Sequence, residues 1–185
     1  KDEGVKASEI EYWELNYLEN VRAEEKYQVD EEEVKQYFEL QTVLKGLFQI
    51  TQQVFGLKYK PVENPSVWHP EVLMYKMYDS DSGDLIGHFY LDLHPRANKY
   101  SHAAMFTMVK GKRYGDEYQL PIASLVTNFP KPTGDTPSLL SHDEAETFFH
   151  EFGHLIHGLV TTADYYVYSG TGVDRDFVEA PSQIM

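Results

Sequence analysis

The feature that most constrains this chain is a predicted helix with two histidines on one face. Ser141 and Glu144 form a capping-box pattern, and the amphipathic pattern that follows predicts a helix through Leu159. The helix contains the sequence HEFGH at residues 150–154. Because residues four apart in an α-helix lie about 40° apart around its axis, the two histidines of this motif can share one metal ion.

The two sides of this helix predict two different roles. The apolar side, which we expect to face the core, consists of Phe148, Phe152, Leu155 and Leu159. The other side carries His150 and His154, which we predict to be metal ligands. Glu151 lies one step around the helix, where its carboxylate reaches a water on the metal more easily than the metal itself. From its position alone, Glu151 is therefore expected to contact a metal-bound water and not to be a ligand.

Two histidines leave a zinc site incomplete, because a catalytic zinc usually has three protein ligands and one open position. A third histidine in the pattern HExxHxxGxxH would fall at Val160, which excludes that pattern. We interpret His157 as a neighbour, because a third ligand from the same rigid helix would be badly aimed. The downstream acids are Asp164, Asp174, Asp176 and Glu179. If Asp176 caps a second helix, Glu179 lies in the first turn of that helix, and Glu179 is the predicted third ligand.

The N-terminal part of the sequence predicts two more helices. Apolar residues recur at three- and four-residue steps from about residue 8 to residue 26. Asp30 followed by Glu33 forms another capping pattern, which predicts a long, buried helix that runs through Phe55 and ends at Gly56.

The middle of the chain predicts two antiparallel strand pairs, because apolar and polar residues alternate there with a period of two. Residues 74–77 pair with 89–93 across a polar turn. Residues 102–109 pair with 120–129, and the basic stretch 110–115 between them is most simply a hairpin loop. The fold class is therefore α+β and mainly helical.

We expect one partial catalytic domain over residues 1–185, because the composition does not shift enough to mark a boundary. Its parts are a helical segment at 1–57, a β-hairpin segment at 58–130 and the metal-binding helices at 138–185. The 185 residues, 42% of them hydrophobic, are enough for a core.

The charge and the missing cysteines exclude several classes of protein. There are 16 Lys and Arg residues against 30 Asp and Glu, a net charge of −14. Nucleic-acid phosphates and anionic lipid surfaces attract basic proteins, so we expect no nucleic-acid partner and no membrane partner. With no cysteine, the chain has no disulfide and no thiolate nucleophile. This fits a reducing compartment, and we expect the cytoplasm.

Longer stretches of the sequence resemble a known family. The segments that carry the resemblance are 89–96 (FYLDLHPR), 99–104 (KYSHAA), 128–132 (NFPKP), 138–154 (SLLSHDEAETFFHEFGH) and 168–183 (YSGTGVDRDFVEAPSQ). Together they closely resemble the thimet oligopeptidase family of zinc peptidases. The similarity runs from about Trp13 to the end of the chain.

The resemblance implies one Zn²⁺, short peptides as substrates and a zincin-like region with a small antiparallel sheet beside the HExxH helix. The implied zinc ligands are His150, His154 and Glu179, and the implied general base is Glu151. Glu146 and Arg175 each precede a ligand by one turn, which makes them candidates for orienting the ligands. The alternative is that both are ordinary exposed charges.

In similar peptidases a strand beside the zinc helix pairs with an extended substrate. Residues 102–106 are the candidate here, and the alternative is a wholly internal strand. Family members are much longer, and their Tyr and His donors to the oxyanion come well after the glutamate ligand. This chain ends six residues past Glu179, so we expect a partial catalytic region that holds zinc but cleaves peptides poorly alone.

Three functions are compatible with these residues. The first is a zinc endopeptidase that cleaves short peptides. The second is a zinc amidase that acts on non-peptide substrates. The third is a non-catalytic module that binds a metal or a peptide.

Overall fold

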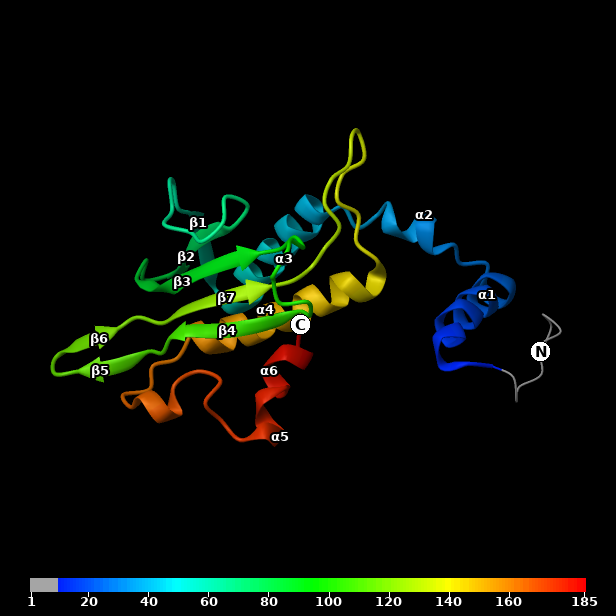
Figure 1. Cartoon of the computed structure of the whole chain (residues 1–185). Helices are drawn as coiled ribbons and strands as arrows, with labels where there is room; N and C mark the ends of the chain where they lie inside the picture. Colours follow the sequence, from blue (N-terminus) through cyan, green and yellow to red (C-terminus); the bar gives the residue numbers. More distant parts are fainter. Residues whose placement is uncertain (1–9) are drawn as a thin grey trace.

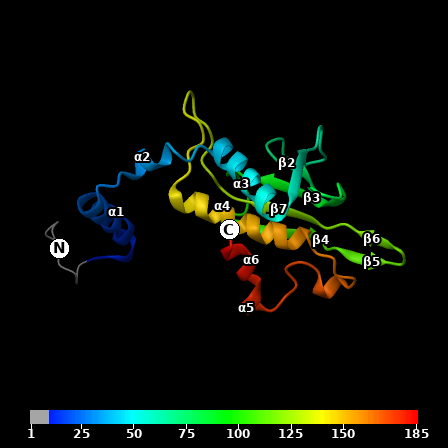
Figure 2. The same cartoon turned by 180° about the vertical axis from the view of Figure 1, so that it is seen from behind.

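The first helix stands apart from the rest of the molecule. A computed structural model describes residues 10–185 (Figure 1), so the start of the helix predicted from residue 8 lies outside the described residues. A 3₁₀ turn, η2 (Tyr12–Glu14), leads into α1 (Leu15–Tyr27). In both views α1 extends away from the other elements (Figures 1 and 2), and none of its residues is buried. The helix prediction is confirmed, but its apolar face has no partner among residues 10–185.

The single long helix predicted from the capping pattern at Asp30 is wrong. The chain instead forms α2 (Glu31–Lys35) and α3 (Leu40–Phe55). Asp30 does cap α2, since its carboxylate accepts a hydrogen bond from the backbone of that helix. The break arises because Glu39 pairs in extended conformation with Leu139, the segment that leads into the histidine helix. The two residues are far apart in the sequence, so the helical periodicity of residues 30–55 does not predict their pairing.

Five strands form one sheet in the order β1-β2-β3-β7-β4. Their bounds are β1 Leu57–Pro61, β2 Leu73–Asp79, β3 Leu85–Asp92, β4 Ala104–Val109 and β7 Ile122–Val126. Both predicted antiparallel pairs are present, β2 with β3 and β4 with β7. However, β3 and β7 are parallel, so the predicted antiparallel sheet is in fact mixed. In the sheet, β7 lies between β3 and β4, and it is parallel to β3 and antiparallel to β4.

The basic stretch predicted as a plain loop also contains strands. It enters a separate two-stranded ribbon of β5 (Lys112–Tyr114) and β6 (Glu117–Gln119). This ribbon is attached to the segment that follows the histidine helix. The Arg113 guanidinium pairs with Asp164 at 2.7 Å, and the Tyr118 hydroxyl donates to the carbonyl of Thr161 at 3.0 Å.

The histidine helix is α4 (His142–Leu159), and its predicted capping box is confirmed. Ser141 Oγ accepts from the Glu144 amide at 3.1 Å, and the Glu144 carboxylate accepts from the Ser141 amide at 2.8 Å. Three short helical segments follow it: η3 (Tyr166–Tyr168), α5 (Arg175–Val178) and α6 (Ala180–Gln183). In the described part of the chain, no helix is long and apolar enough to cross a membrane.

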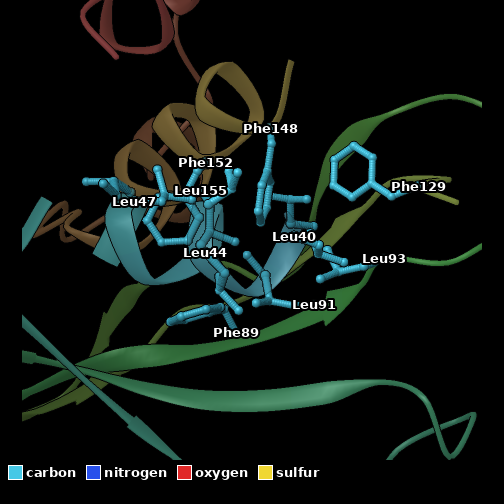
Figure 3. Close-up of a cluster of buried hydrophobic side chains, with 14 of the residues drawn as sticks. Leu40, Leu44, Leu47, Phe89, Leu91, Leu93, Phe129, Phe148, Phe152 and Leu155 are labelled. Atoms are coloured by element: carbon cyan, nitrogen blue, oxygen red, sulfur yellow. The ribbon is translucent and has the colours of Figure 1, made fainter. Parts of the chain in front are cut away.

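The hydrophobic core lies between the sheet and the helices α3 and α4 (Figure 3). The four residues of the apolar side of α4, Phe148, Phe152, Leu155 and Leu159, are all fully buried there. Phe152 packs edge-on against Phe89 of β3, with ring centroids 5.9 Å apart. Burial of this face fixes the rotation of α4, so the opposite face must carry the histidines outward from the core.

Candidate metal centre

Helix α4 presents His150 and His154 side by side. Their ring centroids are 4.8 Å apart, and the side chains are 35% and 13% exposed, respectively. The pair is therefore sheltered by its surroundings but open to solvent on one side. A catalytic metal site needs both properties, because it must exclude most of the bulk water and still admit the substrate.

Glu179 reaches this pair from the junction of α5 and α6. It is the C-cap residue of α5 and the N-cap residue of α6. The N-cap residue of α5 is Asp174, and not the predicted Asp176. The predicted location of Glu179 in the first turn of a helix capped by Asp176 is therefore wrong. The cause is a break in the helix at this residue, after which Pro181 occupies the first turn of α6, a position that proline favours.

Three potential ligand atoms converge at one point. Glu179 Oε2 lies 3.2 Å from His150 Nε2 and 3.0 Å from His154 Nε2. With zinc–ligand bonds of about 2.0–2.1 Å at tetrahedral angles, two ligand atoms on one zinc ion are about 3.3 Å apart. The donor set and its spacing therefore fit a single zinc ion, and small side-chain shifts would accommodate it.

The carboxylate of Glu179 is held ionised by its neighbours. A hydrogen bond from Ser182, followed by the charges of His154 and His150, keeps the pKa of Glu179 below its usual range. An ionised carboxylate is the form that binds a metal ion. The site is thus electrostatically suited to a cation.

Ser182 is a site residue that sequence reasoning missed. Its hydroxyl contacts Glu179 Oε2 at 3.0 Å, and its side chain is buried. The available signal was its spacing, because residues three apart in a helical turn lie on the same side. However, Ser182 is buried by a tertiary contact between α6 and α4, and the residues around Ser182 in the sequence do not predict that contact.

Glu151 lies between α4 and the edge of the sheet. Its Oε2 accepts a hydrogen bond of 2.8 Å from the backbone amide of Met105 in β4, and β4 is the last strand of the sheet. The side chain is half-buried. The motif therefore places a carboxylate, adjacent in sequence to His150, in contact with an edge strand.

The two candidates for orienting the ligands lie at the surface. Glu146 lines a pocket of about 350 Å³ together with His150 and Ser182, and it also belongs to an exposed group with His142 and Asp143. Arg175 is exposed at the start of α5. Among the described hydrogen bonds and ion pairs, neither residue contacts a predicted ligand.

His157 lies apart from the three converging atoms. Its ring packs near Phe177, with centroids 6.3 Å apart, and burial lowers the pKa of His157 below its ordinary value. The group of close ligand atoms on α4 contains His150 and His154 but not His157.

Comparison with known proteins identifies the family. Residues 1–185 match peptidase family M3. The chain belongs to peptidase family M3. The predicted family is thereby confirmed.

Several relatives of this M3 peptidase chain carry names that agree with this. It is 49% identical over 91% of its length to a thimet-like oligopeptidase of Dictyostelium discoideum. It is 41% identical over 94% of its length to saccharolysin of Saccharomyces cerevisiae, and 37% over 96% to oligopeptidase A of Escherichia coli. The chain spans about a quarter of the length of each of these relatives, 25%, 25% and 26%.

The relatives belong to more than one compartment. One is named a mitochondrial intermediate peptidase of Arabidopsis thaliana, 36% identical over 98% of this chain. Another is named a chloroplastic and mitochondrial organellar oligopeptidase A of the same plant. Membership in the family therefore does not select the cytoplasm.

Proposed function

We propose that this chain carries the catalytic centre of a zinc-dependent oligopeptidase. His150, His154 and Glu179 hold one zinc ion, and Glu151 is the general base. The observation that carries the proposal is the convergence of the three ligand atoms, with Glu179 Oε2 at 3.0 and 3.2 Å from the two imidazole nitrogens. The zincin-like fold assignment rests on the same arrangement, in which the HExxH helix lies beside the sheet.

The chemistry divides between the ion and the protein. A bound zinc ion polarises a carbonyl and lowers the pKa of a coordinated water to about 7. Glu151 accepts the proton of the attacking water and delivers it to the leaving amine. Its contact with the Met105 amide at 2.8 Å holds the carboxylate between α4 and β4.

The proposed substrates are short peptides. Since β4 is the edge strand of the sheet and its backbone contacts Glu151, an extended peptide that pairs with β4 would pass beside the base. The names of three of these relatives, which contain the word oligopeptidase, also favour short peptides. The net charge of −14 gives no support for nucleic acid or anionic membrane as a partner.

Two further assignments belong to this proposal. We retain Glu146 as a residue near the metal, because it lines the same pocket as His150, and Arg175 because of its position one turn before Glu179. We retain the cytoplasm as the compartment, because a chain without cysteine fits a reducing environment. The activity, substrates and remaining parts of the longer parent protein are likewise proposals.

Two substitutions test the mechanism by separating metal binding from turnover. Glu151→Gln is expected to leave zinc affinity nearly unchanged and to abolish peptide hydrolysis by the full-length parent, since it removes the base alone. Glu179→Ala is expected to lose zinc. The measurements are equilibrium zinc competition and cleavage of short peptides beside a panel of small amides.

The outcomes distinguish the alternatives. Full peptide cleavage by Glu151→Gln would contradict the assigned base, and no cleavage by the unmodified parent would favour a metal- or peptide-binding module. Cleavage of the small amides but not of the peptides would favour a zinc amidase.

A further inference from the structure

We propose that Ser182 is a positioning residue for the Glu179 carboxylate, which it directs toward His150 and His154. This inference rests on the proposed zinc site, because it assigns a task that matters only if Glu179 is a metal ligand. Ser182 lies outside the HExxH motif, three residues after Glu179 in the sequence.

The first observation is a hydrogen bond to the ligand oxygen itself. The single proton of the Ser182 hydroxyl has two acceptors within hydrogen-bond distance, the Glu179 carbonyl at 2.8 Å and Glu179 Oε2 at 3.0 Å. Oε2 is the same atom that lies within 3.2 Å of both imidazole nitrogens. A bond to the carbonyl alone would be an ordinary local contact at a helix end. The additional contact with Oε2 reaches the proposed ligand.

The second observation is the difference in burial between the two side chains. Ser182 is 2% exposed, whereas the Glu179 side chain is 50% exposed. A half-exposed glutamate has several rotamers, and ordering it opposes binding. A hydroxyl that is itself fixed selects one of these rotamers before the metal arrives, as partners of metal ligands commonly do.

The third observation explains why Ser182 is fixed. At Gly153 of α4, an added Cβ atom would lie 2.7 Å from the Ser182 Cα and 3.1 Å from the Pro181 carbonyl oxygen. The backbone of α6 therefore rests directly on α4, one residue before His154. This close approach is available only to glycine, and it holds the hydroxyl of Ser182 at a constant position relative to both histidines.

The test compares Ser182→Ala with a matched control, Ser138→Ala. Ser138 is also buried, at 3% exposed, and its hydroxyl also donates to a backbone carbonyl, that of Pro130 at 2.6 Å. Zinc affinity is measured by chelator competition, and the stability of the metal-free proteins by thermal unfolding. We expect Ser182→Ala to weaken zinc binding roughly 10–100-fold. Ser138→Ala should bind zinc within about twofold of wild type, since the control loses a similar hydrogen bond away from the ligands.

A spectroscopic measurement separates positioning from a merely structural role. With Co²⁺ in place of zinc, the visible absorption bands report the ligand geometry. We expect Ser182→Ala to change these bands and Ser138→Ala to preserve them. A general loss of structure would instead lower the unfolding temperature of the metal-free protein in both variants.

A second pair of variants keeps the inference testable if Ser182→Ala does not fold. Gly153→Ala should displace α6 and weaken zinc binding in the same way. Gly46→Ala, in α3, is the control, because an added Cβ there meets no atom within 4 Å. Wild-type zinc affinity in Ser182→Ala, or in Gly153→Ala where that pair is used, overturns this inference alone. Absence of zinc binding by the wild-type chain overturns the proposed function itself.

Discussion

At the residue scale, a single carboxylate oxygen connects two parts of the molecule. Glu179 Oε2 faces the imidazoles of His150 and His154 at 3.2 and 3.0 Å. Without a cation, each imidazole nitrogen must donate a proton to stabilise this contact. A divalent cation replaces both protons, because His binds metals through its unprotonated nitrogen. The same geometry therefore serves either protons or a metal ion, and a metal-binding measurement decides between them.

A half-buried tyrosine, Tyr59, makes the stability of the fold depend on pH in the alkaline range. Tyr59 stacks on Phe48, with ring centroids 4.5 Å apart, and its hydroxyl donates to Thr51 Oγ1 at 2.9 Å. Burial raises the pKa of Tyr59 well above its ordinary value, against a smaller opposing effect of Thr51. The folded state thus keeps a proton that the unfolded state releases above a pH of about 10.

We therefore predict that Tyr59 contributes stability that is complete below pH 10 and lost as the pH rises further. The expected loss from this one group is at most about 1.4 kcal/mol per pH unit. Urea unfolding at pH 8 and pH 11 should show a smaller decrease for Tyr59→Phe than for wild type. Tyr37→Phe is the control, because Tyr37 is 75% exposed. Equal decreases in all three proteins would contradict the prediction.

At the element scale, a buried lysine holds the loop between β3 and the edge strand β4. The Lys99 ammonium donates to the carbonyls of Asp92, His94 and Thr127 at 2.8, 2.7 and 2.5 Å, and pairs with the Asp92 carboxylate at 3.0 Å. Burial alone would raise the pKa of Asp92, but hydrogen bonds from Arg96, Trp68 and Lys99 hold that pKa well below its usual range. The network joins the ends of β3 and β7 just before β4 begins.

Lys99→Met is expected to lower the free energy of unfolding by roughly 3–5 kcal/mol, because it removes the charged donor of three backbone carbonyls and one of the two cations paired with Asp92. Lys45→Met, on the exposed side of α3, should change it by about 0.5 kcal/mol or less. Urea unfolding followed by circular dichroism measures both. If the two variants were equally stable, the network would not be what holds this loop.

The elements that sequence predicts well are those whose determinants are local. The capping box at Ser141 and the histidine spacing in α4 depend on residues within a few turns, and both are present in the structure. The break before α3 depends on the pairing of Glu39 with Leu139, and the parallel contact of β3 with β7 depends on how two hairpins meet. Ser182 was missed for the same reason, since its burial comes from the contact with Gly153.

At the scale of the whole molecule, the proposed metal would join a rigid body to its C-terminal segment. Helix α4 is fixed by the core, with Phe148 and Phe152 fully buried. The segment with α5 and α6 contributes Ser182 as its buried helical residue. Helix α1 contributes no buried residue. Zinc should therefore stabilise α4 and α5–α6 directly and leave α1 unaffected.

This unequal coupling can be measured by hydrogen–deuterium exchange with and without zinc. At a zinc concentration 1,000 times the Kd, the folded state gains about 4 kcal/mol. We expect slower amide exchange in α4 and in residues 174–183, because opening either segment would separate Glu179 from the histidines. Exchange in α1 serves as the internal control and should not change. In Glu179→Ala the protection of residues 174–183 should disappear, since that segment no longer supplies a ligand. Equal protection of α1 and residues 174–183 would mean that zinc acts on the chain non-specifically, and not through the three converging ligands.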